Sequence, residues 1–273
     1  MDSQPDNSQR KTLGRTGVKV GRLGISSSYG VPGDALERAF ERGVNYIYWG
    51  SRRRASFGEG LKRLKPHRDK FLLVIQSYAR IAGMLAWSLE RALKTLGYYH
   101  ADVLLLGMWN KAVPRKIMDA ARELRRRGLT RFLAVSTHHR TLVPKYAIDN
   151  DIDIVHFRYN AVHPGAENDI FPLLLANRPG TVSYTATNWG KLIGKPRWPP
   201  LITGAFPIPK SEPTPTAADC YRFALSRPEV DVCMTGPANA AQMDEALEAL
   251  QRGPMTEEEL AWMRRVGRAI LGK

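Results

Sequence analysis

Short apolar runs alternate with longer amphipathic segments along almost the whole chain. The runs are continuously apolar rather than alternating, which is typical of strands covered on both faces of a parallel sheet. The segments between them have a helical period. Eight runs predict strands at residues 22–26, 44–48, 71–76, 102–106, 131–136, 153–157, 181–185 and 231–235.

The amphipathic segments also carry helix start and stop signals. Pro114 and Gly128 bound one predicted helix, and Asn239 and Gly253 bound another. Strand and helix repeated eight times predict an α/β fold, a (β/α)8 TIM barrel that forms a single domain over residues 1–273. In such a barrel the reactive groups lie at the C-terminal ends of the strands.

Two pieces fall outside the repeat. The segment KTLGRTGVKVGRLG predicts an N-terminal β-hairpin before the first strand, with Gly14 or Gly17 at the turn. The segment TEEELAWMRRVGRAI predicts an extra C-terminal helix, in which Thr256 and Glu259 form a capping box. Residues 1–10 are polar, and we expect them to form a disordered tail.

Composition narrows the classes of partner. The chain has 41 Lys and Arg against 26 Asp and Glu, a net charge of +15, but the basic residues are scattered and no nucleic-acid-binding motif is present. We therefore expect a solvated basic surface and no nucleic-acid partner. No run approaches the roughly 18 apolar residues of a membrane span, so no membrane partner is expected. Cys220 and Cys233 are too few for a metal site or a disulfide framework, which predicts a cytoplasmic protein without metal.

Several segments, in register along the chain, resemble the aldo-keto reductase family. They are LGRTGVKVGRLG (its N-terminal hairpin), GVNYI (its second strand), SLERALKTLGYYHADVLLL, AVST, YTATNWGKLIGK and PEVDVCMTGPANAAQMDEAL. The resemblance implies a barrel that reduces carbonyl groups with NADPH.

The resemblance also implies four catalytic residues, an aspartate, a tyrosine, a lysine and a histidine, but this chain departs from the family at each position. The aspartate position falls on Tyr48, the lysine position on Tyr78 and the histidine position on Gly107. The tyrosine position falls near Phe57–Gly58, or on Arg53 if no gap is allowed. The family's activity is therefore not carried over by these residues.

The residues that resemble the family's cofactor site are better preserved. The resemblance implies NADP as cofactor, with NAD as the alternative, because Gly236 and Gln242 stand where the family has the Lys and Arg that bind the 2′-phosphate. The implied contacts are Ser136, Thr137 and His156 for the carboxamide, Tyr184 for the nicotinamide ring, Thr185, Thr187 and Asn188 for pyrophosphate and ribose, and Gly236, Asn239, Gln242 and Glu245 for the adenosine end. The His156 imidazole is also expected to titrate near neutral pH.

Two phenols and an arginine are the candidate catalytic groups. Reduction of a carbonyl needs a proton donor or a positive charge at the developing alkoxide. Tyr48 and Tyr78 end adjacent strands and could donate a proton. Arg54, with Arg52 and Arg53, could supply the positive charge or bind an acidic substrate.

Aromatic residues are expected to line the substrate pocket. Tyr29, Trp49 and Trp109 follow three of the predicted strands. Gly107 would leave a space that Trp109 or the substrate could fill. Several aromatic side chains around one opening favour a bulky, planar or apolar substrate.

Three hypotheses follow. The first is an NAD(P)H-dependent oxidoreductase that acts on a bulky carbonyl or enone with a non-standard proton donor. The second is a catalytically inactive nucleotide-binding relative, and the third is a non-redox barrel enzyme that acts on an anionic substrate. Each has a small-molecule partner, and the sequence does not indicate the oligomeric state.

Overall fold

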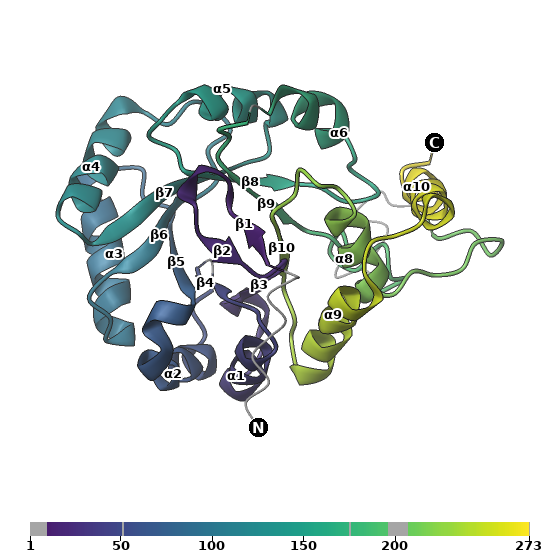
Figure 1. Ribbon diagram of the computed structural model, residues 1–273, viewed down its shortest axis with the longest axis horizontal. Coiled ribbons are helices and arrows are strands. Elements are labelled where there is room, and N and C mark those ends of the chain that lie inside the picture. Colours follow the sequence, from purple (N-terminus) through teal and green to yellow (C-terminus); the bar gives the residue numbers. More distant parts are fainter. Residues whose placement is uncertain (1–9, 51, 175, 196–206, 273) are drawn as a thin grey trace.

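Eight parallel strands close into a barrel at the centre of the molecule (Figure 1). The computed structural model describes residues 10–50, 52–174, 176–195 and 207–272. The strands are β3 (Leu23–Ser26), β4 (Tyr46–Trp49), β5 (Leu72–Ser77), β6 (Ala101–Leu106), β7 (Thr130–Thr137), β8 (Ile154–Arg158), β9 (Gly180–Tyr184) and β10 (Val232–Thr235). They follow the order β10-β3-β4-β5-β6-β7-β8-β9, and β9 pairs with β10 to close the ring. All eight predicted strands are therefore confirmed.

Helices surround the barrel, and Figure 1 shows them as an outer ring. The α-helices of this ring are α1 (Gly33–Glu41), α2 (Ala55–Arg63), α3 (Ala82–Leu96), α4 (Arg115–Arg126), α5 (Val143–Ile148), α6 (Ala166–Asp169), α8 (Ala217–Leu225) and α9 (Ala240–Arg252). Short 3-10 turns occur at η2 (Gly14–Thr16), η3 (Ser27–Tyr29), η4 (Lys65–Lys70), η5 (Arg140–Leu142) and η6 (Phe171–Leu173). Pro114 is the N-cap of α4 and Asn239 is the N-cap of α9, so both predicted helix starts are confirmed.

The N-terminal hairpin covers one end of the barrel. Its strands, β1 (Lys11–Thr12) and β2 (Lys19–Val20), are antiparallel, and Gly17 ends the turn at a φ of 71°. Leu13 and Val20 are fully buried among the side chains that fill the barrel interior. This end is therefore closed, and the opposite end, where the strands have their carboxyl termini, remains for the site.

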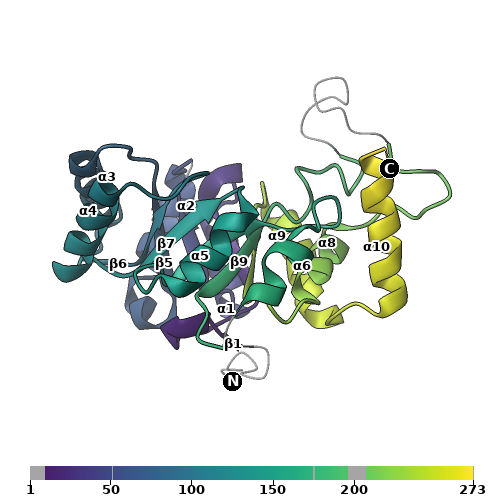
Figure 2. The same cartoon turned by 90° about the horizontal axis from the view of Figure 1, so that it is seen from above.

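The C-terminal helix α10 (Glu257–Ile270) stands outside the ring, beside α8, as the two views show (Figures 1 and 2). Thr256 and Glu259 form the predicted capping box at its start. Of the predicted tail, residues 1–9 lie outside the described residues. No helix in the described part of the chain is long and apolar enough to cross a membrane.

Side chains alternate along each strand between the barrel interior and the shell of helices. On β4, Tyr46 and Tyr48 belong to the interior cluster, whereas Ile47 and Trp49 belong to the cluster between strands and helices. This alternation decides which residues can reach the open end of the barrel.

Candidate functional site

The carboxyl ends of the strands form the mouth of the barrel. On each strand, the residue two positions after the last residue of the barrel interior lies on the same face of the sheet and therefore points towards the barrel axis. Such side chains form the floor of the mouth. These residues are Ser26, Tyr48, Gln76, Ser136, His156, Arg158 and Tyr184. This set contains no carboxylate, so the described floor can be positively charged or neutral but not negatively charged.

Tyr48 is the next-to-last residue of β4 and lies near Gln76 of β5. The Tyr48 side chain is 9% exposed. Its hydroxyl lies beside Gly50, because a Cβ added at Gly50 would stand 2.8 Å from Tyr48 Oη and 2.6 Å from Gln76 Cβ. The phenol therefore faces the mouth and adjoins the Gln76 side chain.

Arg53 brings a positive charge to this phenol. Its guanidinium donates a hydrogen bond of 2.9 Å to the Gln76 carbonyl oxygen. Much of the Arg53 side chain is exposed, but burial of the guanidinium end lowers its pKa, while the Tyr48 phenol acts in the opposite direction. The hydrogen bond to Gln76 therefore keeps the positive charge of Arg53 near the Tyr48 phenol.

Of the two candidates for the family's tyrosine position, Arg53 lies near Tyr48, and Phe57 is buried away from the mouth. Phe57 is fully buried within α2 and stacks on Trp49, with ring centroids 6.2 Å apart. Arg54, the arginine predicted to be catalytic, is exposed and is the N-cap residue of α2. Arg53 thus adjoins Tyr48, and Arg54 faces solvent.

Tyr78 lies beyond the end of β5, and its side chain is 48% exposed. The last inward-facing residue of that strand is Gln76. A Cβ at Gly107 would stand 2.5 Å from Gln76 Nε2 and 2.8 Å from the Tyr78 ring. The expected space at Gly107 is therefore filled, by the Gln76 amide and the Tyr78 ring and not by Trp109.

The three predicted pocket aromatics lie in different places. Trp109 follows β6, and the Arg80 guanidinium stacks over its ring at 4.1 Å. Trp49 does not line the mouth: it is 2% exposed and packs against Phe57, because the alternation that turns Tyr48 inward turns Trp49 towards the helices. Tyr29 contacts the loop after β10, where a Cβ at Gly236 would meet its ring at 2.6 Å.

The predicted carboxamide contacts include two neighbours in the barrel. Ser136 and His156 are paired across β7 and β8. Ser136 Oγ accepts a hydrogen bond of 2.8 Å from the Met108 N–H, and His156 Nε2 lies 2.8 Å from Tyr46 Oη. Burial lowers the pKa of His156 to about 3, so the expectation that it titrates near neutral pH is wrong.

The predicted nicotinamide contact, Tyr184, belongs to the next strand. Its hydroxyl donates a hydrogen bond of 2.9 Å to the carbonyl oxygen of Thr137 and lies 3.1 Å from His138 Nδ1. Burial raises the pKa of this phenol, and Arg158, its partner across β8 and β9, acts against that rise.

Backbone strain is concentrated in the loop after β9. Thr185, Asn188 and Trp189 have φ values of 60°, 49° and 53°, a region that a β-branched residue such as threonine rarely adopts. The Asn188 side chain is 1% exposed, and its Oδ1 has no hydrogen-bond partner among the described residues. Thr187 is partly buried in the same loop. Strain and an unsatisfied buried acceptor together are typical of a ligand-binding loop.

The start of α9 is satisfied by its own side chains. Asn239 Oδ1 accepts from the Gln242 N–H at 3.0 Å, and Gln242 Oε1 accepts from the Ala238 N–H at 2.7 Å. Glu245 Oε1 accepts from the Ala217 N–H at 2.9 Å, which ties α9 to the start of α8. The predicted adenosine contacts thus surround one helix start, but much of their hydrogen-bonding capacity is used within the protein.

Sequence reasoning missed two residues of the mouth, Gln76 and Arg158. The spacing of two from Val74 and from His156 was the signal for both. Arg158 is half-buried, and it has no carboxylate partner among the described residues. Repulsion by Arg158 adds to burial in lowering the pKa of His163 to about 4.

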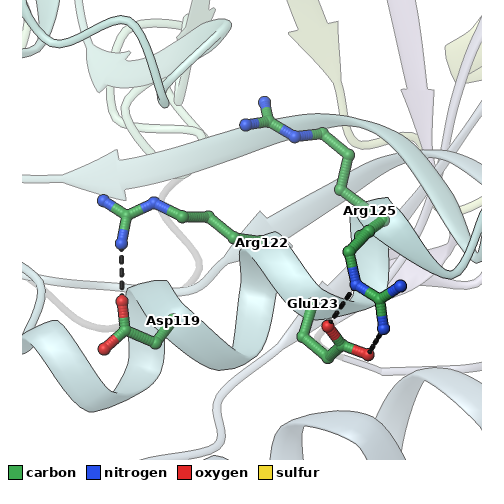
Figure 3. A pocket seen from close by; sticks show the side chains of 5 residues that line it. Asp119, Arg122, Glu123 and Arg125 are labelled. Carbon is green, nitrogen blue, oxygen red and sulfur yellow. Dashed lines mark hydrogen bonds and ion pairs between the residues drawn. The ribbon is translucent and has the colours of Figure 1, made fainter.

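Two of the hollows on the described part of the surface bear on the choice of site. One, of about 410 Å³, lies along the outer face of α4 (Figure 3). Its charges pair with one another, Arg122 with Asp119 at 2.6 Å and Arg126 with Glu123 at 2.7 Å, so it offers no unsatisfied group to a ligand. The other, of about 610 Å³, adjoins the mouth and includes Arg53 and Gln76 in its lining. We place the candidate site at the second hollow and the mouth.

Comparisons with known proteins agree with this geometry. The profile of the Aldo/keto reductase family matches residues 33–268. The holo form of an aldo-keto reductase from Bacillus halodurans superposes with a TM-score of 0.76 at 18% identity, covering 96% of this chain and 97% of that one. Its apo form gives 0.74 at 18% identity, covering 96% of each chain. A search of curated proteins returns no match. The family profile spans most of the chain, and the chain therefore belongs to the aldo/keto reductase family, whose fold it shares.

Proposed function

We propose that the protein reduces a bulky carbonyl or enone with NADPH, and that Tyr48 is its proton donor. The observation that carries this proposal is the position of the Tyr48 hydroxyl. It faces the mouth at a strand end, beside Gln76 and within the field of Arg53. A phenol in such a place can protonate a developing alkoxide, and a nearby cation stabilises the phenolate that remains.

The residues around the mouth fit a reduced dinucleotide. Ser136, His156 and Tyr184 would hold the nicotinamide end, and the unsatisfied Asn188 Oδ1 would accept a hydrogen bond from a ribose hydroxyl or an amide. When bound, the dinucleotide supplies the hydride. NADP is the proposed cofactor, as the family resemblance implies. NAD is the alternative, because Gln242 is uncharged where the 2′-phosphate of NADP would need a cation.

The other residues of the mouth have supporting roles in this proposal. The Gln76 amide can donate a hydrogen bond to the substrate oxygen and so orient the carbonyl. Tyr184 and Tyr46 remain protonated because burial raises the pKa of both phenols. His156 is neutral because its pKa is about 3, so it serves as a hydrogen-bonding group and not as an acid.

The test is the variant Tyr48→Phe. We expect the rate of NADPH oxidation with an aryl ketone or enone panel to fall by about 10²–10⁴, the usual cost of losing a general acid. The affinity for NADPH, measured by calorimetry, should stay the same. The matched control is Tyr99→Phe, since Tyr99 is 95% exposed. An unchanged rate in Tyr48→Phe would exclude Tyr48 as the proton donor.

A second candidate function is nucleotide binding without turnover. It is favoured because the resemblance gives Tyr48, Tyr78 and Gly107 to three of the family's four catalytic positions, and Phe57–Gly58 or Arg53 to the fourth, so none of the four residue types is kept. It predicts NADPH binding with no oxidation by any carbonyl or enone. A non-redox activity on an anion, which the cations Arg53 and Arg158 would suit, instead predicts no binding of either dinucleotide.

A further inference from the structure

A groove with apolar walls leads from the mouth along the start of α3. It has a volume of about 610 Å³, within the usual range for small-molecule sites. Its lining residues are Arg53, Gln76, Ser77, Tyr78, Ala79, Arg80, Ile81, Met84, Trp87 and Ser88. Gln76 and Arg53 also belong to the mouth, so groove and mouth are continuous.

The apolar walls are unusually exposed. Tyr78, Ile81, Met84 and Trp87 are 48%, 65%, 51% and 56% exposed, although each is a large apolar side chain. Ile81 is the N-cap of α3, and Met84 and Trp87 follow it at intervals of three residues, so that the three form one stripe at the start of the helix. The opposite face of the helix, around Leu89, is buried in the core. A contiguous exposed apolar patch beside a site indicates a binding surface.

The polar part of the groove is cationic. Its lining contains two arginines and no Asp or Glu. Arg80 is committed to the protein, because it stacks on Trp109 and donates hydrogen bonds to the carbonyl oxygens of Tyr78 (3.2 Å) and Met108 (2.9 Å). Arg53 donates one hydrogen bond, to the Gln76 carbonyl oxygen, and has no carboxylate partner in the described part of the chain. Arg53 is thus the cation that a ligand can engage.

We propose that this groove binds an apolar carboxylate, with its carboxylate group on Arg53 and its flat or chain-like body against Met84 and Trp87. The proposal rests on the proposed function in that it names the substrate class of the same site. A guanidinium matches the two oxygens of a carboxylate. The Arg91 guanidinium lies over one face of the Trp87 ring at 5.0 Å, so the ligand would pack against the other face. The substrate would then be an apolar acid that carries the reducible carbonyl or enone next to Tyr48.

Calorimetry with 2-naphthoate and its neutral isostere 2-naphthamide tests the proposal without turnover. We expect naphthoate to bind at least tenfold more tightly than naphthamide, the usual effect of one charged hydrogen-bonding group. Arg53→Gln should remove this preference and leave naphthamide binding unchanged, whereas Arg53→Lys should keep part of it because the charge remains. Trp87→Ser should weaken both ligands by about tenfold.

Two control variants match these changes at remote exposed sites. Arg115→Gln removes an arginine whose side chain is 92% exposed on α4, and Tyr99→Ser removes an exposed aromatic ring before β6. Neither should alter the binding of either ligand. Equal affinity for acid and amide, or no effect of Arg53→Gln, would overturn the proposal. So would sedimentation showing a dimer that Trp87→Ser dissociates, since the stripe would then belong to a second copy.

The failure of this proposal can be told apart from the failure of the proposed function. If neither dinucleotide binds but naphthoate is preferred through Arg53, the reductase proposal fails and the groove assignment stands. If NADPH is oxidised with neutral enones and acids show no preference, the groove assignment fails and the reductase proposal stands.

Discussion

The buried imidazole of His156 should make the protein sensitive to acid, and the variant His156→Gln tests this. His156 is 3% exposed inside the barrel, and its described partner is the hydroxyl of Tyr46, itself fully buried. Burial alone lowers its pKa from 6.5 to about 3, with no carboxylate to oppose the shift. Glutamine is the chosen replacement because it can still hydrogen-bond Tyr46 but cannot be protonated.

The sign and size of the effect follow from linkage. Between pH 6.5 and about 3 the unfolded chain binds the proton and the folded chain does not, so the free energy of unfolding falls as the pH falls through this window. At 1.36 kcal/mol per pH unit, the full difference is about 5 kcal/mol. Between pH 7.5 and pH 5 the loss is about 2 kcal/mol.

Urea unfolding of both proteins at pH 7.5, 6 and 5 measures this difference. The half-buried His138 and His163 also have lowered pKa values, but they remain in both proteins and cancel. The native protein should therefore lose about 2 kcal/mol more than His156→Gln between pH 7.5 and 5. Parallel pH profiles for the native protein and His156→Gln would refute the reasoning.

Three further changes probe the rest of the architecture. Asp231→Asn should lower the free energy of unfolding by about 3–5 kcal/mol in urea, because the fully buried Asp231 accepts two hydrogen bonds, of 2.7 and 2.6 Å, from Arg178 and its loss leaves that charge uncompensated. Thr185→Gly should raise the stability by about 1 kcal/mol, since glycine relieves the strained φ of 60°, while calorimetry should show weaker NADPH binding by a loosened loop. Gly107→Ala should cost about 1–3 kcal/mol because the new Cβ would stand 2.5 Å from Gln76 Nε2, and the double variant with Gln76→Ala should recover part of this loss.

The fold was predictable because its signals are local. A buried parallel strand reads as a continuous apolar run, and the eight runs correspond to the eight strands of the barrel within one or two residues at each end. The capping box of α10 and the glycine at the hairpin turn are likewise fixed by neighbouring residues. Such signals need no knowledge of what the element packs against.

The direction of individual side chains was harder to predict, because it depends on contacts between segments that are distant in the sequence. A strand that is apolar on both faces does not reveal which residues face the interior, so Tyr48 and Trp49 read alike although only Tyr48 faces the mouth. Arg53 and Arg54 are adjacent in a loop, and only the hydrogen bond of Arg53 to the end of β5 distinguishes them. The low pKa of His156 depends on burial by strands distant in sequence, which no local pattern reports.

The glycines of the mouth are matched to the larger side chains beside them. Gly50 is compatible with Tyr48 and Gln76 because a Cβ there would stand 2.8 Å from the phenol oxygen and 2.6 Å from Gln76 Cβ. Gly107 is compatible with Gln76 and the neighbouring tyrosine ring for the same steric reason. At each glycine a larger neighbour fills the space, so no cavity remains there to reduce the stability.

The charges follow the same logic. An aspartate and a lysine that face one another form a buried pair, and removing only one partner leaves an uncompensated charge, whereas replacing both can be nearly neutral. Here the resemblance gives the two positions to Tyr48 and Tyr78, which do not form such a pair. The cation that acts on Tyr48, Arg53, enters from the exposed rim, where its charge remains partly solvated. Restoring one of the family's catalytic residues at a time should therefore not raise the reductase activity, because its usual partner residue would still be absent. The packing and the charges of the mouth therefore support the proposed role of the Tyr48 phenol.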